Sequence, residues 1–186
     1  MDKDKLRQFI ADSQKAGLAP QEIDRLIQKN NTKFSPQLPS IPQGVSILPK
    51  QFPITQEVGN YNPALYRGIN KSMTNTGLDV GAPTGTPLNL PLGQWQVEEV
   101  GGGYNRGYGT STVVKNTKTG EKLRFSHLSE IYDIKPGQVL EGGGTFGKVG
   151  RSGHATGSHL DLEMYDPQGK LQDITKSSYA DILFPK

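Results

Sequence analysis

The chain has 186 residues, a net charge of +3 and no cysteine, and it is rich in glycine (23) and proline (13). The absence of cysteine excludes disulfides and thiolate metal sites, and the basic residues are too scattered to indicate a nucleic-acid partner. The glycine and proline content favours short strands joined by turns over a helical bundle. No segment resembles a signal peptide or a membrane span, so we expect neither a signal for export nor membrane insertion.

The N-terminal part of the chain differs from the rest in its pattern. Apolar residues recur at helical spacing over residues 4–16 and 20–29, which predicts a short helical hairpin within residues 1–30. Residues 31–53 contain five prolines among serine, glutamine and asparagine, which is typical of an extended linker or strap. We expect residues 1–53 to bind other protein subunits. A loosely packed cap without a partner is the alternative.

From residue 54 to residue 186 the pattern is that of a mainly β, antiparallel domain, because short β-prone runs alternate with strong turn signals. A short helix is predicted at the end of the chain, over Ser178–Phe184. The predicted strands are Leu78–Val80, Pro87–Leu90, Gln94–Val100, Thr110–Asn116, Lys122–His127, Gln138–Leu140, Gly147–Val149 and His159–Tyr165.

The last of these strands carries the most informative pattern in the sequence. A glycine-rich turn runs directly into His159, and apolar Leu160 and Leu162 alternate with polar residues. Alternate side chains of a strand share a face, so His159, Asp161 and Glu163 are expected to lie together while the leucines enter the core. A strand with one solvated polar face would give the same pattern.

Three segments resemble those of lysostaphin/LytM-type zinc metallopeptidases, which are peptidoglycan endopeptidases. They are Gly77–Pro87, the aromatic-x-His-Leu segment that contains His127, and Gly150–Glu163, which resembles the segment ending in HxH. The resemblance extends over roughly residues 51–186. It implies the duplicated hybrid motif fold of that family, in which a His, an Asp and the second His of HxH bind zinc.

Carried over by position, the zinc ligands implied by the resemblance fall on Asn75, Asp79 and Asp161, so two of the three are substituted. His127 and His159 match the two further histidines that flank the scissile bond in the family, and Tyr108 is expected beside them in the groove. The third histidine, His154, lies at a variable position of the glycine turn, where a surface residue is expected rather than a replacement ligand.

The chemistry of these residues leaves two interpretations open. Asn75, Asp79 and Asp161 form an oxygen-rich set that suits Ca²⁺, Mg²⁺ or Mn²⁺ better than zinc, with Glu163 as a further candidate ligand. In the metal-free interpretation, which we favour, a protonated His127 or His159 pairs with one of the aspartates. We therefore expect no cofactor, although zinc or another divalent cation is possible.

Three functions are compatible with this pattern. The first is a catalytically degenerate domain that serves as a structural or cell-wall-binding module, or regulates a cell-wall hydrolase, and that contacts peptidoglycan stem peptide. The second is a component of a phage tail or virion, since a wall-peptidase-like domain with a helical hairpin and a Pro-rich arm resembles such proteins. The third is an active peptidoglycan endopeptidase with unusual metal ligands. A phage protein would be virion-associated; otherwise we expect a cytoplasmic protein until it is delivered to the cell wall.

Overall fold

The computed structural model describes residues 46–60 and 74–184. The predicted hairpin over residues 1–30 and the part of the Pro-rich arm before residue 46 lie outside these described residues. Along the chain the strands are β1 (Ile54–Gln56), β2 (Leu78–Val80), β3 (Pro87–Asn89), β4 (Gln94–Gly101), β5 (Thr110–Asn116), β6 (Lys122–Ile131), β7 (Val139–Glu141), β8 (Thr145–Val149), β9 (Leu160–Tyr165) and β10 (Leu171–Gln172). Three 3-10 turns complete the elements: η1 (Asn105–Gly107), η2 (Ile174–Lys176) and η3 (Ala180–Ile182).

The prediction of a mainly β, antiparallel domain is confirmed, since the ten strands form one sheet and pair antiparallel. All eight predicted strands are present, although β6 continues to Ile131, four residues beyond the predicted end at His127. The short strands β1 and β10 have no counterpart in the prediction. In place of the predicted helix over Ser178–Phe184 there is the single turn η3.

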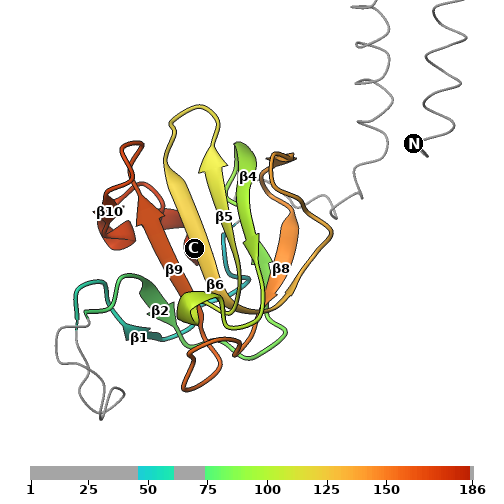
Figure 1. Cartoon of the computed structure of the whole chain (residues 1–186). Coiled ribbons are helices and arrows are strands. Elements are labelled where there is room, and N and C mark those ends of the chain that lie inside the picture. Colours follow the sequence, from blue (N-terminus) through green and yellow to red (C-terminus); the bar gives the residue numbers. More distant parts are fainter. Residues whose placement is uncertain (1–45, 61–73, 185–186) are drawn as a thin grey trace, which may run out of the picture. The chain divides into compact units, whose positions relative to one another are not determined.

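Strand order in the sheet places β9 at the centre of the functional region. The order is β1-β2-β9-β6-β5-β4-β7, while β8 pairs with β3 and β6, and β10 pairs with β9 (Figure 1). β9 is therefore held on one side by β2 and on the other by β6. This arrangement brings together the three segments, far apart in sequence, that carry the motif residues.

The hydrophobic core includes one face of β9, where Leu160 and Leu162 are fully buried, as their alternation predicts. Phe125 and Phe146 pack against each other in this core, with ring centroids 4.7 Å apart. The opposite face of β9 is not solvated, because Glu163 on that face is also fully buried. The interpretation of β9 as a strand with one solvated face is therefore wrong.

Residues 46–48 belong to the folded β unit. Ile47 and Leu48 are fully buried, and their backbone N–H groups donate to the carbonyls of Ile182 (2.7 Å) and Leu183 (3.1 Å). The end of the predicted strap is thus anchored to the C-terminal turn η3 by both apolar burial and backbone hydrogen bonds.

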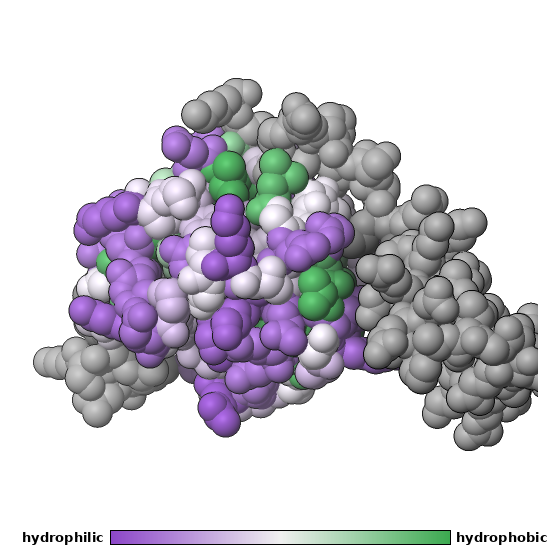
Figure 2. All heavy atoms as spheres, turned by 90° about the horizontal axis from the view of Figure 1, so that it is seen from above, coloured by the Kyte–Doolittle hydropathy of each residue, from purple (hydrophilic) through white to green (hydrophobic). Residues whose placement is uncertain are grey.

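Large hydrophobic residues are exposed at a few separate places among the described residues: Ile54, Leu92, Val100, Tyr104 and Val139. The face seen from above is mostly hydrophilic, and hydrophobic residues form small separate patches on it (Figure 2). No helix among the described residues is long and apolar enough to cross a membrane.

Candidate functional site

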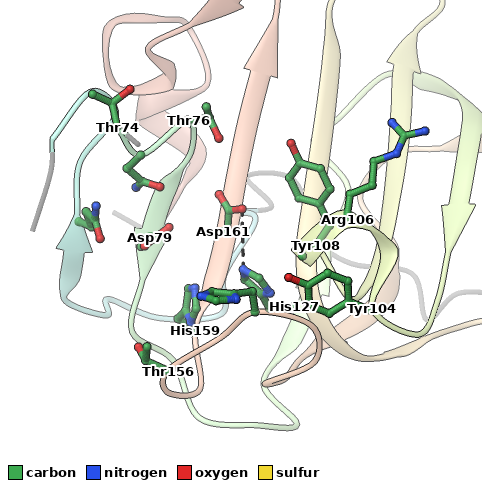
Figure 3. A pocket seen from close by; sticks show the side chains of 14 residues that line it. Thr74, Thr76, Asp79, Tyr104, Arg106, Tyr108, His127, Thr156, His159 and Asp161 are labelled. Carbon is green, nitrogen blue, oxygen red and sulfur yellow. Dashed lines mark ion pairs between the residues drawn. The ribbon is translucent and has the colours of Figure 1, made fainter. Parts of the chain in front are cut away.

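A pocket of about 380 Å³ opens over β2, β9 and β6, and it is lined by the site residues predicted from the sequence with the exception of Glu163 (Figure 3). Its walls come from the segment before β2, the η1 loop, the bulge of β6 and the glycine turn before β9. The residues lining it are Gln56, Thr74, Asn75, Thr76, Asp79, Tyr104, Arg106, Gly107, Tyr108, His127, His154, Thr156, His159 and Asp161.

Two aspartates from neighbouring strands lie at the bottom of this pocket. Asp79 on β2 and Asp161 on β9 are direct cross-strand partners, so their side chains share one face of the sheet. The residues on either side of Asp79, Leu78 and Val80, pair with the buried leucines of β9. Because these apolar pairs fix the register, the two carboxyl groups are held close together on the pocket side.

Both carboxyl groups are buried. Asp79 is 9% exposed and Asp161 is 7% exposed, and burial raises the pKa of each above its usual range. For Asp161 the pKa rise is large, because the negative charges of Glu163 and Asp79 add to the effect of burial. Among the described residues, Oδ1 of Asp161 has no hydrogen-bond partner. A buried acceptor in that state is costly, so the site has an unused capacity to accept a hydrogen bond.

The close approach of β2 to β9 depends on Gly77. A Cβ built on this residue would lie 1.7 Å from Oδ1 and 2.9 Å from Cγ of Asp161. Only glycine therefore leaves room for the Asp161 carboxylate in its present position.

Asn75, which is half-buried, lines the same pocket. Its side-chain Nδ2 donates to the carbonyl of Gly77 at 2.6 Å, which fixes the amide against its own turn. The amide also contacts Asp79, where it partly offsets the rise in pKa that burial causes. Asn75 therefore acts here as a local hydrogen-bonding residue.

His127 points into the pocket because of a bulge in β6. Ser126 and His127 together oppose a single residue of β5, and His127 has a φ of 61°, in the left-handed region. A bulge of this kind re-aims a side chain relative to the rest of its strand. Nδ1 of His127 donates to the carbonyl of Ser152 at 2.8 Å, which leaves Nε2 facing the pocket.

A histidine is expected to pair with one of the aspartates, and His127 does lie near Asp161 without forming a hydrogen bond to it. Nε2 of His127 lies 3.9 Å from Oδ2 of Asp161, which is too long for a hydrogen bond (Figure 3). Burial lowers the pKa of His127 while it raises that of Asp161, so both groups are shifted toward their neutral forms.

His159 sits at the end of the glycine turn, beside His127. Its Nδ1 donates to the carbonyl of Gly157 at 2.9 Å, and its backbone forms a bridge with Gly150. The two imidazole rings lie with their centroids 4.6 Å apart and their planes inclined by 48°. In the neutral rings, both Nε2 atoms are therefore hydrogen-bond acceptors.

Next to the pocket lies a charged cluster that the sequence did not predict, centred on Glu163. Its carboxylate accepts hydrogen bonds from the hydroxyls of Thr76 and Tyr165, each at 2.5 Å, and lies 3.3 Å from Nε of Arg124. The Arg124 guanidinium in turn stacks on the ring of Tyr108, 4.4 Å from its centroid. Glu163 itself does not line the pocket, and its carboxylate is already engaged by Thr76, Tyr165 and Arg124.

The η1 loop forms the opposite wall and supplies two residues that sequence reasoning missed, Tyr104 and Arg106. Tyr108 from the same loop lies beside them, as predicted, and burial raises the pKa of its hydroxyl. His154 is exposed, as expected of a surface residue, and its backbone N–H donates to the carbonyl of Gly107 at 2.7 Å. This bond joins the glycine turn to the η1 loop at the pocket wall.

The donor set does not fit a zinc ion. Catalytic zinc is held by three protein ligands drawn mainly from His, Asp, Glu and Cys, whereas here one of the three positions carries a neutral amide already bonded to Gly77. Within residues 46–60 and 74–184, no group of three or more His, Cys, Asp or Glu side chains is arranged to hold a metal ion.

A curated protein is similar to this chain over part of its length. DD-carboxypeptidase/endopeptidase Mpg of Neisseria meningitidis is 30% identical over 124 residues, which cover 59% of this chain and 27% of that protein. The chain thus spans about a quarter of the length of that curated relative.

Two solved structures share the fold. A zinc-containing peptidase from Vibrio cholerae matches with a TM-score of 0.58 and 23% identity, over 73% of this chain and 40% of that one. The catalytic domain of lysostaphin from Staphylococcus simulans matches with a TM-score of 0.55 and 23% identity, over 67% and 90%. The model of peptidase family M23 matches residues 73–174, more than half of the sequence, and the chain therefore belongs to peptidase family M23.

Proposed function

We propose that this protein is a non-catalytic M23 domain, which binds peptide in its pocket without cleaving it and serves as a structural or cell-wall-binding module. The observation that carries the proposal is the donor set at the bottom of the pocket. Asn75, Asp79 and Asp161 occupy the positions that resemble the family's zinc ligands, and the Asn75 amide is bonded to its own turn.

The remaining groups do not replace a Lewis acid. The two imidazoles are adjacent, and burial lowers the pKa of His127, so this ring does not supply a positive charge to a peptide carbonyl. The nearest carboxyl group, Asp161, is held by burial toward its protonated form. Amide hydrolysis needs an activated water and stabilisation of the developing oxyanion, and these residues provide neither.

The test places histidines at the two substituted positions that resemble the family's zinc ligands. The wild-type chain and the double variant Asn75→His/Asp161→His are purified without chelator, and bound zinc and release of peptides from peptidoglycan are measured. We expect the double variant to retain stoichiometric zinc and the wild-type chain to retain none and to release no peptide, even after addition of zinc or manganese. Stoichiometric zinc together with peptide release in the wild-type protein would refute the proposal.

An active endopeptidase with unusual metal ligands is the second candidate. The observation in its favour is that His127 and His159 line one pocket together with two carboxyl groups. The same assay decides it, because release of peptides by the wild-type chain with manganese, calcium or magnesium would support this candidate over the first. A regulator of another hydrolase would instead change the activity of that enzyme when added to it.

A role in a phage tail or virion, with residues 1–53 bound to neighbouring subunits, remains a proposal. It is supported by the resemblance of the domain organisation and by the close packing of residues 46–48 into the domain, which would hold such an arm firmly. Co-purification of the native full-length chain with other subunits, and its loss on deletion of residues 1–40, would test it. A phage protein would be found in virions, and a bacterial one in the cytoplasm until its delivery to the wall.

A further inference from the structure

The bottom of the pocket is lined by hydrogen-bond acceptors whose capacity is not used. Oδ1 of Asp161 is buried against Gly77 and has no hydrogen-bond partner within the described part of the chain, and Oδ2 lies 3.9 Å from Nε2 of His127. Asp79 lies beside it as its cross-strand partner. Nδ1 of both His127 and His159 donates to a backbone carbonyl, so each neutral ring turns an acceptor, Nε2, to the pocket.

The donors near the pocket are largely engaged elsewhere. The Asn75 amide donates to Gly77, and the Thr76 hydroxyl donates to Glu163. Arg124 is paired with Glu163 and Glu99. The side chain of Arg106 extends from the η1 loop away from the two aspartates (Figure 3). Among the described residues, the pocket therefore combines two aspartate carboxyl groups with two imidazole acceptors, and few donors are free to bond them.

We propose that this pocket binds the primary ammonium group of a peptide in the place where the family binds zinc. An ammonium group is a compact positive charge with three donors and no acceptor, which complements two carboxyl groups and two imidazole nitrogens. It does not need the six to eight oxygen ligands that calcium requires. The volume of about 380 Å³ admits the amine together with several adjoining atoms of its chain.

The aromatic wall supports the same ligand. Tyr104 lines the side of the pocket opposite Asp79 (Figure 3), and an ammonium group near an aromatic face gains further stabilisation. This inference rests on the proposed peptide-binding function and specifies which part of the peptide the pocket recognises. The amine could come from a side chain, as in a diamino acid, or from a free N-terminus.

Two pairs of small probes distinguish these sources. Nα-acetyl-lysine methylamide offers only a side-chain amine, and glycyl-glycinamide offers only an α-amine. The matched controls are the same molecules with that amine acetylated. Each probe is titrated into the full chain and followed by two-dimensional amide NMR, which reports binding at Asp79 and Asp161 separately from binding elsewhere.

We expect saturable shifts around Asp79 and Asp161 with at least one amine probe and none with its acetylated control. Asp161→Asn and Asp79→Asn should each weaken binding about tenfold or more, which corresponds to about 1.4 kcal/mol. Asp133→Asn is the matched control, because Asp133 is exposed and pairs only with Lys135 among the described residues. The spectrum of each variant shows whether it is folded.

Several results would overturn the inference. The first two are equal binding of amine and acetylated probes, and unchanged binding of the amine in both aspartate variants. The others are no binding of any amine probe, and stoichiometric binding of zinc or calcium that is not displaced by an amine. Equal binding of acetylated probes would refute the ammonium site and leave peptide binding intact. Amine binding without retention of the protein on peptidoglycan would support the ammonium site and refute the wall-binding function.

Discussion

The contact between Gly77 and Asp161 makes a sharp prediction about stability. In Gly77→Ala the new Cβ would overlap Oδ1 of Asp161 at 1.7 Å and crowd Cγ of Glu163 at 3.3 Å. The Asp161 side chain is buried and short, so it cannot swing away without losing its place beside Asp79. Overpacking of this kind costs about 1–3 kcal/mol, so we expect the free energy of unfolding to fall by about 2 kcal/mol.

Thermal unfolding measures this change. A loss of about 2 kcal/mol should lower Tm by roughly 4–8 °C for a domain of this size. Gly102→Ala is the control, because a Cβ there meets no atom within 4 Å, and its Tm should stay unchanged. If the overlap with Asp161 is the cause, Asp161→Ala should rescue Gly77→Ala, with a coupling of about 1 kcal/mol or more in a double-mutant cycle. A Gly77→Ala protein as stable as the control would refute the reasoning.

Three further predictions concern the regions around the site. Glu163→Gln should lower the free energy of unfolding by about 3 kcal/mol in urea, because it leaves the Arg124 charge without its buried partner; an unchanged urea midpoint would contradict this. Ile47→Ala should lose about 2–5 kcal/mol in the same assay, whereas Ile54→Ala, at a residue 44% exposed, should lose far less; similar losses would show that residue 47 is not part of the core. Burial raises the pKa of Tyr179 from 10.0 to about 12, so its contribution to stability is present below pH 10 and is lost as the pH rises toward 12. Tyr179→Phe should therefore lose less stability than the wild-type chain between pH 10 and 12, and parallel losses in the two proteins would refute this.

The sequence allowed most of the sheet to be predicted, because its patterns are local. The alternation of Leu160 and Leu162 with polar residues assigned the two faces of β9 correctly. The glycine and proline turns marked the breaks between strands. The resemblance to the LytM family then indicated which polar residues meet, and the register of Asp79 against Asp161 agrees with that grouping.

Other features depend on contacts between distant segments and leave no local signal. The bulge at His127 occurs in a run without glycine, so nothing in the sequence marks its left-handed backbone. The partners of Glu163 come from three separate segments, before β2, in β6 and at the end of β9. A period-two pattern places Glu163 on the same face as Asp161, but only the fold shows that Thr76 and Arg124 cover it.

Backbone hydrogen bonds between the start and the end of the described β unit also affect how the chain folds during its synthesis. They run from Ile47 and Leu48 to Ile182 and Leu183. These bonds join the first described residues of the β unit to some of its last, and Leu48 and Leu183 are both buried in the core. Contacts between residues so far apart in sequence are late and slow to form. On the ribosome, the central strands can pair as they emerge. The part of the core that contains Leu48 and Leu183 stays uncovered until residue 183 has left the exit tunnel. A chain that terminates a few residues early would thus carry a nearly complete sheet and an uncovered apolar edge, which is the kind of species that aggregates or is degraded.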